Sequence, residues 1–266
     1  MASKQKKIRL DELLVQKELA ESRNAAKSLI MAGMISVDGK KTDKAGTQVS
    51  IESIIEIKGK ACPYVSRGGL KLEGALDYCG VALTGATALD IGASTGGFTD
   101  CLLQHGAKLV YAVDVGHGQL HWKLRNDPRV INIERVNARN IGADIIPVMV
   151  DVITIDVSFI SIKKIIPQAI NLLKQDGVII ALIKPQFEVG KGEVGKGGIV
   201  KSPEKHRALL FDMADFLLKS GLHIKTIIAS PIKGQDGNIE FFGVAAKEKP
   251  LTEADISEMI EKAAGL

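Results

Sequence analysis

Three glycines and two aspartates lie together in the segment from Leu89 to Asp100, which reads LDIGASTGGFTD. Glycines after an apolar strand let the backbone turn tightly and approach a ligand, and a helical pattern begins at Gly97. The spacing is GxxxGG, whereas the pyrophosphate cradle of a dinucleotide-binding protein needs GxGxxG. Asp90, which this pattern places inside the turn, would repel a phosphate but favour the ammonium group at the methionine end of S-adenosylmethionine. We therefore predict a loop that binds this cofactor. The candidate contacts are Asp90, Gly92, Ser94, Thr95, Gly96, Gly97 and Phe98.

A further carboxylate supports this interpretation. Asp114 ends the next apolar segment, 17 residues beyond Gly97, where it can accept hydrogen bonds from both hydroxyls of an adenosine ribose. Arg135 and Asn137 follow the third apolar segment and are candidates for the adenine side of the pocket. A glycine pair alone is often an ordinary turn, and an aspartate at a strand end often caps a helix. Their joint occurrence favours a cofactor site.

Four charged residues that are distant in sequence are expected at one edge of the same fold. Asp156 and Lys184 would end adjacent strands, Glu240 would begin the last strand, and Lys71 would lie early in the first helix. A lysine that is desolvated beside a second cation has a lowered pKa and can serve as a base. Methylation of a ribose hydroxyl, a very weak acid, needs such a base and in-line placement against the methyl group. The spacing alone leaves a second interpretation open, a set of surface salt bridges.

The elements that would position these residues alternate between apolar strands and helices over residues 66–266. Such alternation predicts an α/β fold, a Rossmann-like parallel sheet with helices on both faces. The last two strands are joined by a short loop, which predicts an antiparallel pair and a seven-stranded sheet of the methyltransferase type. The expected strands are 88–92, 109–114, 130–135, 150–156, 178–184, 224–229 and 239–245. The expected helices are 70–78, 97–104, 120–125, 162–173, 203–220 and 252–264.

A smaller α+β module is expected at residues 1–60, with an interdomain linker at 61–65. Apolar spacing over 9–33 predicts two short helices, the second capped by Ser22 and ended by Gly33, followed by strands at 34–37, 48–51 and 54–57. This segment holds 12 Lys or Arg against 8 Asp or Glu, while the rest of the chain holds 23 of each. The charge excess favours nucleic acid, although an ordinary solvated surface would also explain it. The candidate RNA-binding residues are Arg9, Arg23, Lys27, Lys40 and Lys41.

Composition excludes several other classes of protein. The chain has 266 residues, of which 45% are hydrophobic, and its longest apolar run, Val178 to Ile183, is far too short to span a membrane. Its three cysteines show no paired spacing, so we expect neither a disulfide framework nor a metal site. Residues 190–197 resemble a P-loop but lack its Ser or Thr and its direct passage from strand to helix, and we interpret them as a lid. We expect a cytoplasmic protein.

Five segments together resemble the TlyA family, also called hemolysin A: SRGGLKL (66–72), the glycine loop, IDVSFIS (155–161), LIKPQFE (182–188) and NIEFF (238–242). RLDELL (9–14) and residues 22–39 resemble the S4 RNA-binding domain of the same family. The resemblance implies an FtsJ-like domain that uses S-adenosylmethionine to methylate a cytidine ribose 2′-hydroxyl in ribosomal RNA. It also implies that Lys184 is the base, that Asp156 and Lys71 orient it, and that Glu240 holds the target ribose.

The partners implied are ribosomal RNA or ribosomal subunits, without a membrane or an obligate protein partner. Two alternatives remain at this point. The first is a hemolysin-like membrane-lytic protein, which the absence of a spanning segment or a strongly amphipathic basic helix disfavours. The second is an RNA-binding protein with an inactive methyltransferase domain, against which all four candidate catalytic residues are present.

Overall fold

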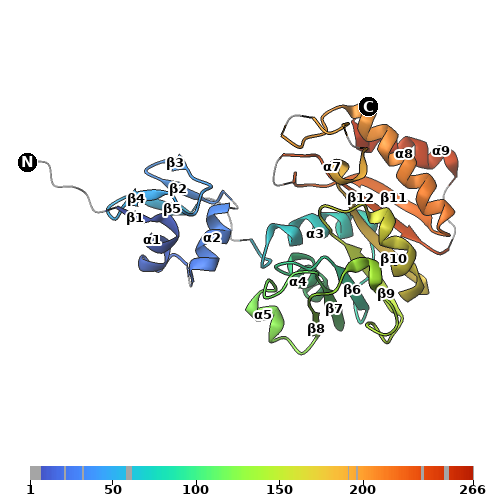
Figure 1. Cartoon of the computed structure of the whole chain (residues 1–266), viewed down its shortest axis with the longest axis horizontal. Helices are drawn as coiled ribbons and strands as arrows, with labels where there is room; N and C mark the ends of the chain where they lie inside the picture. Colours follow the sequence, from blue (N-terminus) through green and yellow to red (C-terminus); the bar gives the residue numbers. More distant parts are fainter. Residues whose placement is uncertain are drawn as a thin grey trace, which may run out of the picture. The chain divides into compact units, whose positions relative to one another are not determined.

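The computed structural model describes residues 7–20, 22–31, 33–57, 62–190, 192–195, 197–234, 237–248 and 252–265. The chain forms two compact units, residues 1–63 and 64–266, and the division falls inside the expected linker. Residue 61 of that linker and the basic residues Lys4, Lys6, Lys191 and Lys196 lie outside the described residues. Figure 1 shows both units, which are considered separately below.

The first unit is a small α+β module. Helices α1 (Leu10–Gln16) and α2 (Arg23–Met31) pack on each other beside the strands (Figure 1). The strands form a pair of β1 (Lys7–Arg9) with β4 (Gln48–Ser50) and a three-stranded sheet in the order β3 (Lys40–Lys41), β2 (Ile35–Val37), β5 (Ile55–Ile57). Their core includes fully buried Leu10, Leu13, Leu14 and Ile30.

Local signals explain most of this unit. Ser22 caps α2 as predicted, since its Oγ accepts a hydrogen bond of 3.2 Å from the Ala25 N–H. Asp38 and Gly39 both have positive φ, 50° and 79°, as the tight hairpin between β2 and β3 requires. Strands β1 and β3 were not predicted. Both are short and rich in Lys or Arg, so neither shows the apolar alternation that identifies a strand.

The second unit contains the seven-stranded, mostly parallel sheet that the sequence predicts. Its order is β11-β12-β10-β9-β6-β7-β8, and only β12 runs antiparallel to its neighbours. All five residues of β6 and all six of β12 are buried, so both faces of the sheet are covered. The strands are β6 (Thr87–Ile91), β7 (Leu109–Val113), β8 (Val130–Ile133), β9 (Val150–Ile155), β10 (Leu173–Ile183), β11 (His223–Ala229) and β12 (Phe241–Ala246).

Outside residues 162–173, the described residues of this unit form six helices, and all of them except α7 (Pro185–Glu188), which was not predicted, lie near predicted positions. They are α3 (Arg67–Cys79), α4 (Gly97–Gln104), α5 (Trp122–Arg125), α7 (Pro185–Glu188), α8 (Pro203–Lys219) and α9 (Glu253–Ala264). Among the described residues, no helix is both long and apolar enough to cross a membrane. The described His, Cys, Asp and Glu side chains form no group of three that could hold a metal ion.

The region from Ile162 to Leu173 differs from the prediction of one continuous helix. It consists of η2 (Ile162–Lys164), α6 (Ile166–Ala169) and η3 (Ile170–Leu172), and Leu173 already belongs to β10. Pro167 lacks the N–H that a continuous helix would need, and β-branched neighbours precede it. Strand β10 was predicted to begin at Val178 because the residues just before it are polar, and the ladder to β9 is irregular there.

Candidate active site

The glycine loop follows β6 and turns with positive φ at three residues. These are Gly92 (88°), Ser94 (48°) and Gly96 (96°), and Gly96 is the residue that precedes α4. A Cβ atom on Gly92 would lie 2.3 Å from the carbonyl oxygen of Asp156, and one on Gly97 would lie 2.2 Å from Ser66 Oγ. Glycine is therefore required both for the turn and for the close approach of neighbouring backbone.

Asp114 directly follows β7 and is fastened to this loop. Its Oδ2 accepts a hydrogen bond of 2.8 Å from the Ser94 N–H, and its Oδ1 accepts one of 2.6 Å from the Gly116 N–H. The two features that suggested a cofactor site are thus in direct contact. The carboxylate remains half-exposed beside the turn, so a ligand in the loop can also reach it.

Asp90 does not lie in the turn, contrary to the sequence prediction. It is in β6 with its side chain fully buried, where it accepts hydrogen bonds from Thr99 Oγ1 (2.6 Å) and Thr154 Oγ1 (3.0 Å). Burial raises the pKa of Asp90 to about 7. The carboxyl group therefore joins α4 and β9 to β6 behind the loop, because both of its oxygens already have partners inside the protein.

Two other predicted loop contacts have internal neighbours as well. The Phe98 ring is 3% exposed and stacks on Phe242 with centroids 6.1 Å apart, so the ring belongs to the core. The Thr95 carbonyl accepts a hydrogen bond of 3.2 Å from the His121 N–H, which draws the chain after β7 onto the glycine loop. These residues shape the loop, and the ring of Phe98 is not available to a ligand.

Arg135 and Asn137 follow β8 at the same edge of the sheet. Arg135 is exposed, has a positive φ of 62°, and donates its backbone N–H to the Gly116 carbonyl at 3.1 Å. The Asn137 Oδ1 accepts from the Arg139 N–H at 3.1 Å and caps η1 (Ala138–Asn140). Arg135 therefore lies next to the turn that Asp114 organises, and Asn137 follows two residues later at the start of η1.

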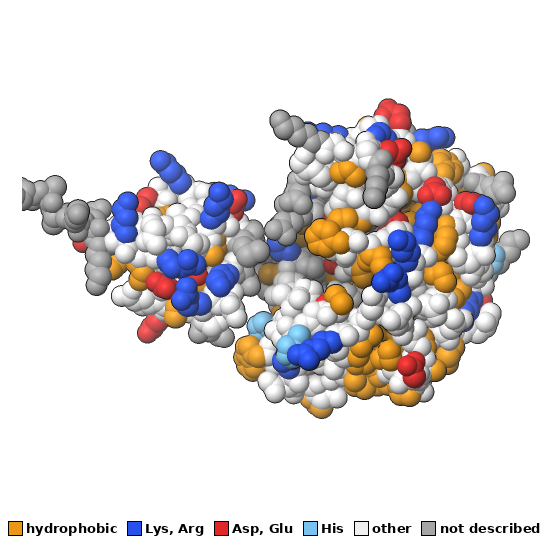
Figure 2. Space-filling model, viewed as in Figure 1, with side chains coloured by type: hydrophobic (Ala, Val, Ile, Leu, Met, Phe, Trp, Pro, Cys, Tyr) orange, Lys and Arg blue, Asp and Glu red, His pale blue; other side chains and the backbone are white. Residues whose placement is uncertain are grey.

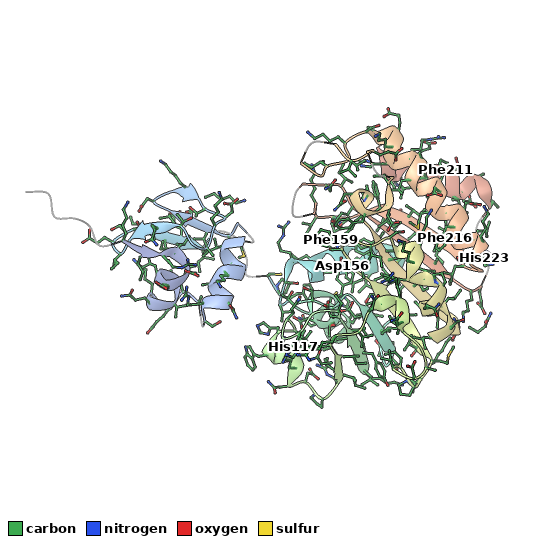
Figure 3. The ribbon with its side chains drawn as sticks, viewed as in Figure 1. His117, Asp156, Phe159, Phe211, Phe216 and His223 are labelled. Carbon is green, nitrogen blue, oxygen red and sulfur yellow. The ribbon has the colours of Figure 1, made fainter. Side chains whose placement is uncertain are left out.

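A neighbouring network fastens the turn after β7 to the end of β8. Glu134 accepts hydrogen bonds from the Gly118 N–H and from Arg125, and lies 2.5 Å from His117 Nδ1. The backbone hydrogen bond from Gly118, together with His117 and Arg125, lowers the pKa of Glu134 to about 2. His117 lies at the rim of this region in Figure 3. The network stabilises the edge where Arg135 and Asn137 are found.

The four candidate catalytic residues form two close ion pairs. Lys184 Nζ lies 2.5 Å from Asp156 Oδ1, and Lys71 Nζ lies 2.6 Å from Glu240 Oε2. The side chains are 11% and 22% exposed in the first pair and 13% and 3% in the second. Both contacts are salt bridges, and their side chains are mostly enclosed by the protein, unlike a fully exposed surface pair. Each lysine contacts a carboxylate directly, whereas the sequence argument had placed a lysine beside a second cation.

Strand register places the two pairs at one edge of the sheet. Ile183 pairs with Phe241, so Lys184 and Glu240 are the next positions on adjacent strands β10 and β12. Asp156 follows β9, and its N–H donates to the Ile91 carbonyl at 2.9 Å, directly before the glycine loop. Parallel strands end together at this edge, where doubly wound folds bind their ligands.

Two functional candidates beside Lys184 were missed from sequence, although both lie in the IDVSFIS segment. Ser158 Oγ accepts a hydrogen bond of 3.1 Å from Lys184 Nζ. Phe159 has a positive φ of 64°, and its ring is 91% exposed with its centroid 5.1 Å from that of Phe187. Figure 3 shows Phe159 close to Asp156. A large aromatic ring exposed beside enclosed charges suggests a binding surface. The pattern of charges in the sequence does not reveal that exposure.

Glu188 and Asn238 hold the loops around this edge. Glu188 accepts hydrogen bonds from Ser161 Oγ (2.5 Å) and the Ile162 N–H (2.8 Å), and burial raises its pKa. Asn238 Nδ2 donates to the Gly198 carbonyl at 2.9 Å, while its Oδ1 accepts from the Val200 N–H at 3.0 Å. Asn238, close to Glu240 in the chain, therefore holds the residues that directly follow 190–197, the segment expected to be a lid.

In the first unit, two of the five candidate RNA-binding residues converge on one carboxylate. Buried Asp11 accepts two hydrogen bonds of 2.9 Å from Arg9 and one of 3.3 Å from Arg23. Mainly through the Arg9 hydrogen bond, this arrangement lowers the pKa of Asp11 to about 2. The arginine side chains remain 39% and 51% exposed, and Arg23 Nη1 also pairs with Glu12 at 3.1 Å, so only the N–H groups that remain are open to a ligand.

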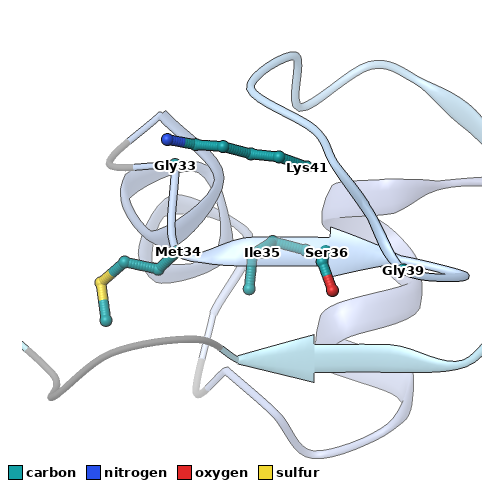
Figure 4. Close-up of a pocket in the computed structure, with 6 residues that line it drawn as sticks. All are labelled: Gly33, Met34, Ile35, Ser36, Gly39 and Lys41. Atoms are coloured by element: carbon teal, nitrogen blue, oxygen red, sulfur yellow. The ribbon is translucent and has the colours of Figure 1, made fainter.

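The other three basic candidates lie elsewhere on the unit. Lys27 is on α2, while Lys40 and Lys41 form β3 in the separate three-stranded sheet. Lys41 extends across Gly33 beside a pocket of about 280 Å³ that Met34, Ile35, Ser36 and Gly39 also line (Figure 4). On the visible face of this unit, Figure 2 shows more Lys and Arg than Asp and Glu.

Comparison with known families agrees with both units. Residues 64–247 match the model of the FtsJ-like methyltransferases, and residues 8–55 match the S4 domain. The chain belongs to the FtsJ-like methyltransferase family. The match confirms the fold class inferred above from alternating strands and helices, and the relatives named next confirm the resemblance to TlyA.

Relatives of known name cover almost the whole chain. YqxC of Bacillus subtilis (strain 168), provisionally named an rRNA methyltransferase, is 46% identical over 97% of this chain and 94% of its own length. The Mycobacterium tuberculosis 16S/23S rRNA (cytidine-2′-O)-methyltransferase TlyA is 43% identical over 89% of each chain. The solved structure of a Streptococcus thermophilus protein, provisionally described as a hemolysin, is 40% identical in sequence and has a TM-score of 0.76. The match covers 98% of this chain and 97% of the S. thermophilus chain.

Proposed function

We propose that this protein transfers a methyl group from S-adenosylmethionine to the ribose 2′-hydroxyl of a cytidine in ribosomal RNA. The observation that carries the proposal is the buried Lys184–Asp156 pair directly beside the glycine loop. A general base is needed where a weakly acidic hydroxyl must attack a methyl group. The name of the M. tuberculosis relative, 43% identical to this chain, supports the choice of nucleotide and RNA. Such a substrate implies a cytoplasmic location.

The residues around the glycine loop fit this cofactor. The backbone turns with positive φ at Gly92 and Gly96, which exposes the loop to a ligand, and the Asp114 carboxylate beside it suits two ribose hydroxyls. When bound, S-adenosylmethionine supplies an electrophilic methyl group on a sulfonium. Asp90, being fully buried, acts by positioning α4 behind the loop rather than by touching the cofactor.

The catalytic residues divide the work between two pairs. Lys184 in its neutral form accepts the proton of the 2′-hydroxyl while that oxygen attacks the methyl group, and Asp156 holds the amine in place and stabilises the resulting ammonium. Glu240, held in position by Lys71, accepts a hydrogen bond from the target ribose. The exposed ring of Phe159 offers a face on which a base can stack.

In the first unit, we assign the Arg9–Asp11–Arg23 cluster to RNA phosphate. Two guanidinium groups held by one buried carboxylate present a fixed set of donors, which suits phosphate oxygens. Contacts of this kind position structured RNA and make binding depend on salt, while the bound nucleotide is selected elsewhere. Lys27, Lys40 and Lys41 would add weaker phosphate contacts.

The test is transfer of labelled methyl groups from S-adenosylmethionine to purified ribosomal subunits. The wild-type protein should label rRNA at a ribose that becomes resistant to alkaline cleavage, and Lys184→Ala should lower turnover by about 10²–10⁴-fold. Lys219→Ala, at an exposed position on α8, is the matched control and should retain activity. Full activity of Lys184→Ala would refute the assignment of the base, and absence of labelling despite tight cofactor binding would favour another substrate. Failure to bind the cofactor would indicate an inactive methyltransferase domain.

A further inference from the structure

The Lys184 amine lies between two acceptors, and only one of them is a carboxylate. Its Nζ is 2.5 Å from Asp156 Oδ1 and donates a hydrogen bond of 3.1 Å to Ser158 Oγ. We infer that Ser158 is a positioning residue that, together with Asp156, aims the lone pair of the Lys184 amine at the target hydroxyl. This inference rests on the proposed function, in which Lys184 is the base.

The argument follows from the geometry of a neutral primary amine. Nζ carries one bond to Cε, two N–H bonds and one lone pair in a tetrahedral arrangement. Ser158 accepts one N–H in a hydrogen bond, and Asp156 Oδ1 lies on a second side of the amine as an ion-pair partner without hydrogen-bond geometry, so few directions are left for the lone pair. With Asp156 alone, the amine would still rotate among staggered positions about Cε–Nζ, and only some of them direct the lone pair at the substrate.

The reaction balances with these groups. The proton of the ribose 2′-hydroxyl passes to the lone pair of Lys184, and the oxygen electron pair forms the new O–CH₃ bond. The S–CH₃ bond breaks, its electron pair stays on sulfur, and the ammonium of Lys184 later returns its proton to water. Ser158 exchanges no proton in this sequence, and it acts only through the orientation of Lys184.

The fold holds the serine in this position from two sides. Phe159 adopts a left-handed φ of 64° directly after it, which is unusual for an aromatic residue, and its own ring is left exposed. Glu188 binds Ser161 and the Ile162 N–H from α7, the short helix that begins immediately after Lys184. The loop that carries Ser158 and the strand end that carries Lys184 are therefore fixed to the same element. Ser158 itself is exposed and is not part of the core.

The experiment compares Ser158→Ala with Ser158→Thr in the full chain acting on ribosomal subunits. Ser158→Ala should lower kcat about tenfold, the size of one modest hydrogen bond, and leave the cofactor Kd and the KM for the subunits unchanged. Ser158→Thr keeps a hydroxyl and should restore most of the rate. Ser220→Ala, which removes a hydroxyl from the end of α8, is the control and should behave as wild type.

The pH dependence of kcat distinguishes positioning from a general structural effect. The Ser158 hydroxyl accepts more strongly from an ammonium than from a neutral amine, so its loss disfavours the protonated base. The rising limb of the kcat profile should therefore move to lower pH in Ser158→Ala, while the plateau at high pH stays below that of wild type.

The outcomes separate this inference from the function on which it rests. If Lys184→Ala is inactive but Ser158→Ala matches wild type at every pH, only the role of Ser158 is overturned. If Ser158→Ala and Ser158→Thr both lose cofactor binding or melt at lower temperature, the residue is structural and the inference is equally overturned. If Lys184→Ala retains full activity, the proposed base itself is wrong.

Discussion

Both units of the molecule contain ion pairs between cations and carboxylates, but the cations are exposed to solvent in one unit and enclosed in the other. Around Asp11 the carboxylate is buried and the two arginines are 39% and 51% exposed. At the sheet edge the lysines are 13% or less exposed, and each is paired with its own carboxylate. An exposed guanidinium pair is suited to grip phosphate, whereas an enclosed amine is suited to transfer a proton at one atom. The same charges thus serve binding in one unit and chemistry in the other.

The enclosed pairs should be the most sensitive to substitution. Glu240→Gln keeps the shape of the side chain but leaves Lys71 without a charged partner in a largely buried place. We expect stability to fall by about 3 kcal/mol, because a buried charge is left uncompensated. We also expect turnover to fall by about 10- to 100-fold, because a hydrogen bond to a charged group contributes about 1.5–3 kcal/mol. Thermal melts and single-turnover methylation measure the two effects.

Replacing both partners gives the control for that prediction. The double variant Lys71→Met, Glu240→Gln leaves no uncompensated charge, so it should recover stability but not activity. If Glu240→Gln were as stable and active as wild type, the pair would not be the enclosed counterpart of the arginine cluster, and the contrast between the units would fail.

Substitutions in the exposed Arg9–Asp11–Arg23 cluster should change the affinity for RNA but not turnover. Asp11→Asn makes the protein more positive by one charge, which by itself strengthens binding to RNA. We nevertheless expect RNA affinity to fall about five- to tenfold, because Arg9 and Arg23 lose the carboxylate that orients them. The salt dependence of binding should become shallower by about one phosphate contact, and kcat at saturating RNA should not change.

A matched substitution tests whether orientation or charge is responsible. Asp43→Asn makes the same charge change at an exposed position of the same unit and should not weaken binding. If Asp11→Asn and Asp43→Asn raised the affinity for RNA equally, Asp11 would not be orienting Arg9 and Arg23. The lowered pKa of Asp11, about 2, also predicts that its contribution to stability is present above about pH 4 and is lost as the pH falls towards 2.

The sequence predicted the sheet well because its central strands are short apolar runs bounded by glycine or charge. The start of β10 was not predictable from the spacing of apolar residues, since most of its first residues are polar. The break at Pro167 within the expected helix was not predicted either. Asp90 was misplaced because a carboxylate next to a glycine turn has the same sequence pattern whether it faces the ligand or the core. Its burial depends on Thr99 and Thr154, which come from other elements.

The sequence predicted those candidate site residues whose type indicates their chemistry, but it did not predict their contacts. Charged residues at strand ends and at the start of the first helix made Lys71, Asp156, Lys184 and Glu240 candidates, but did not show which lysine pairs with which carboxylate. Ser158 was missed because a serine hydroxyl gains its role from a contact with Lys184, 26 positions away. The left-handed backbone at Phe159, which favours glycine elsewhere, gives no sequence signal in an aromatic residue.

Asp90 is a third arrangement, a buried carboxyl group held by two hydroxyls without a cation, and it should have the smallest effect. Its pKa of about 7 in the folded protein lies above the ordinary value of 3.8, so the folded state binds more protons between about pH 4 and 7. Stability of the second unit should therefore decrease as the pH rises through that window and then level off. Asp90→Asn cannot ionise, so it should lose this decrease and be more stable than wild type at pH 8. Urea unfolding followed by the single tryptophan, Trp122 of the second unit, measures the profile. Asp144→Asn, at an exposed position, should keep the wild-type slope, and the same slope in Asp90→Asn would show that Asp90 does not cause the decrease.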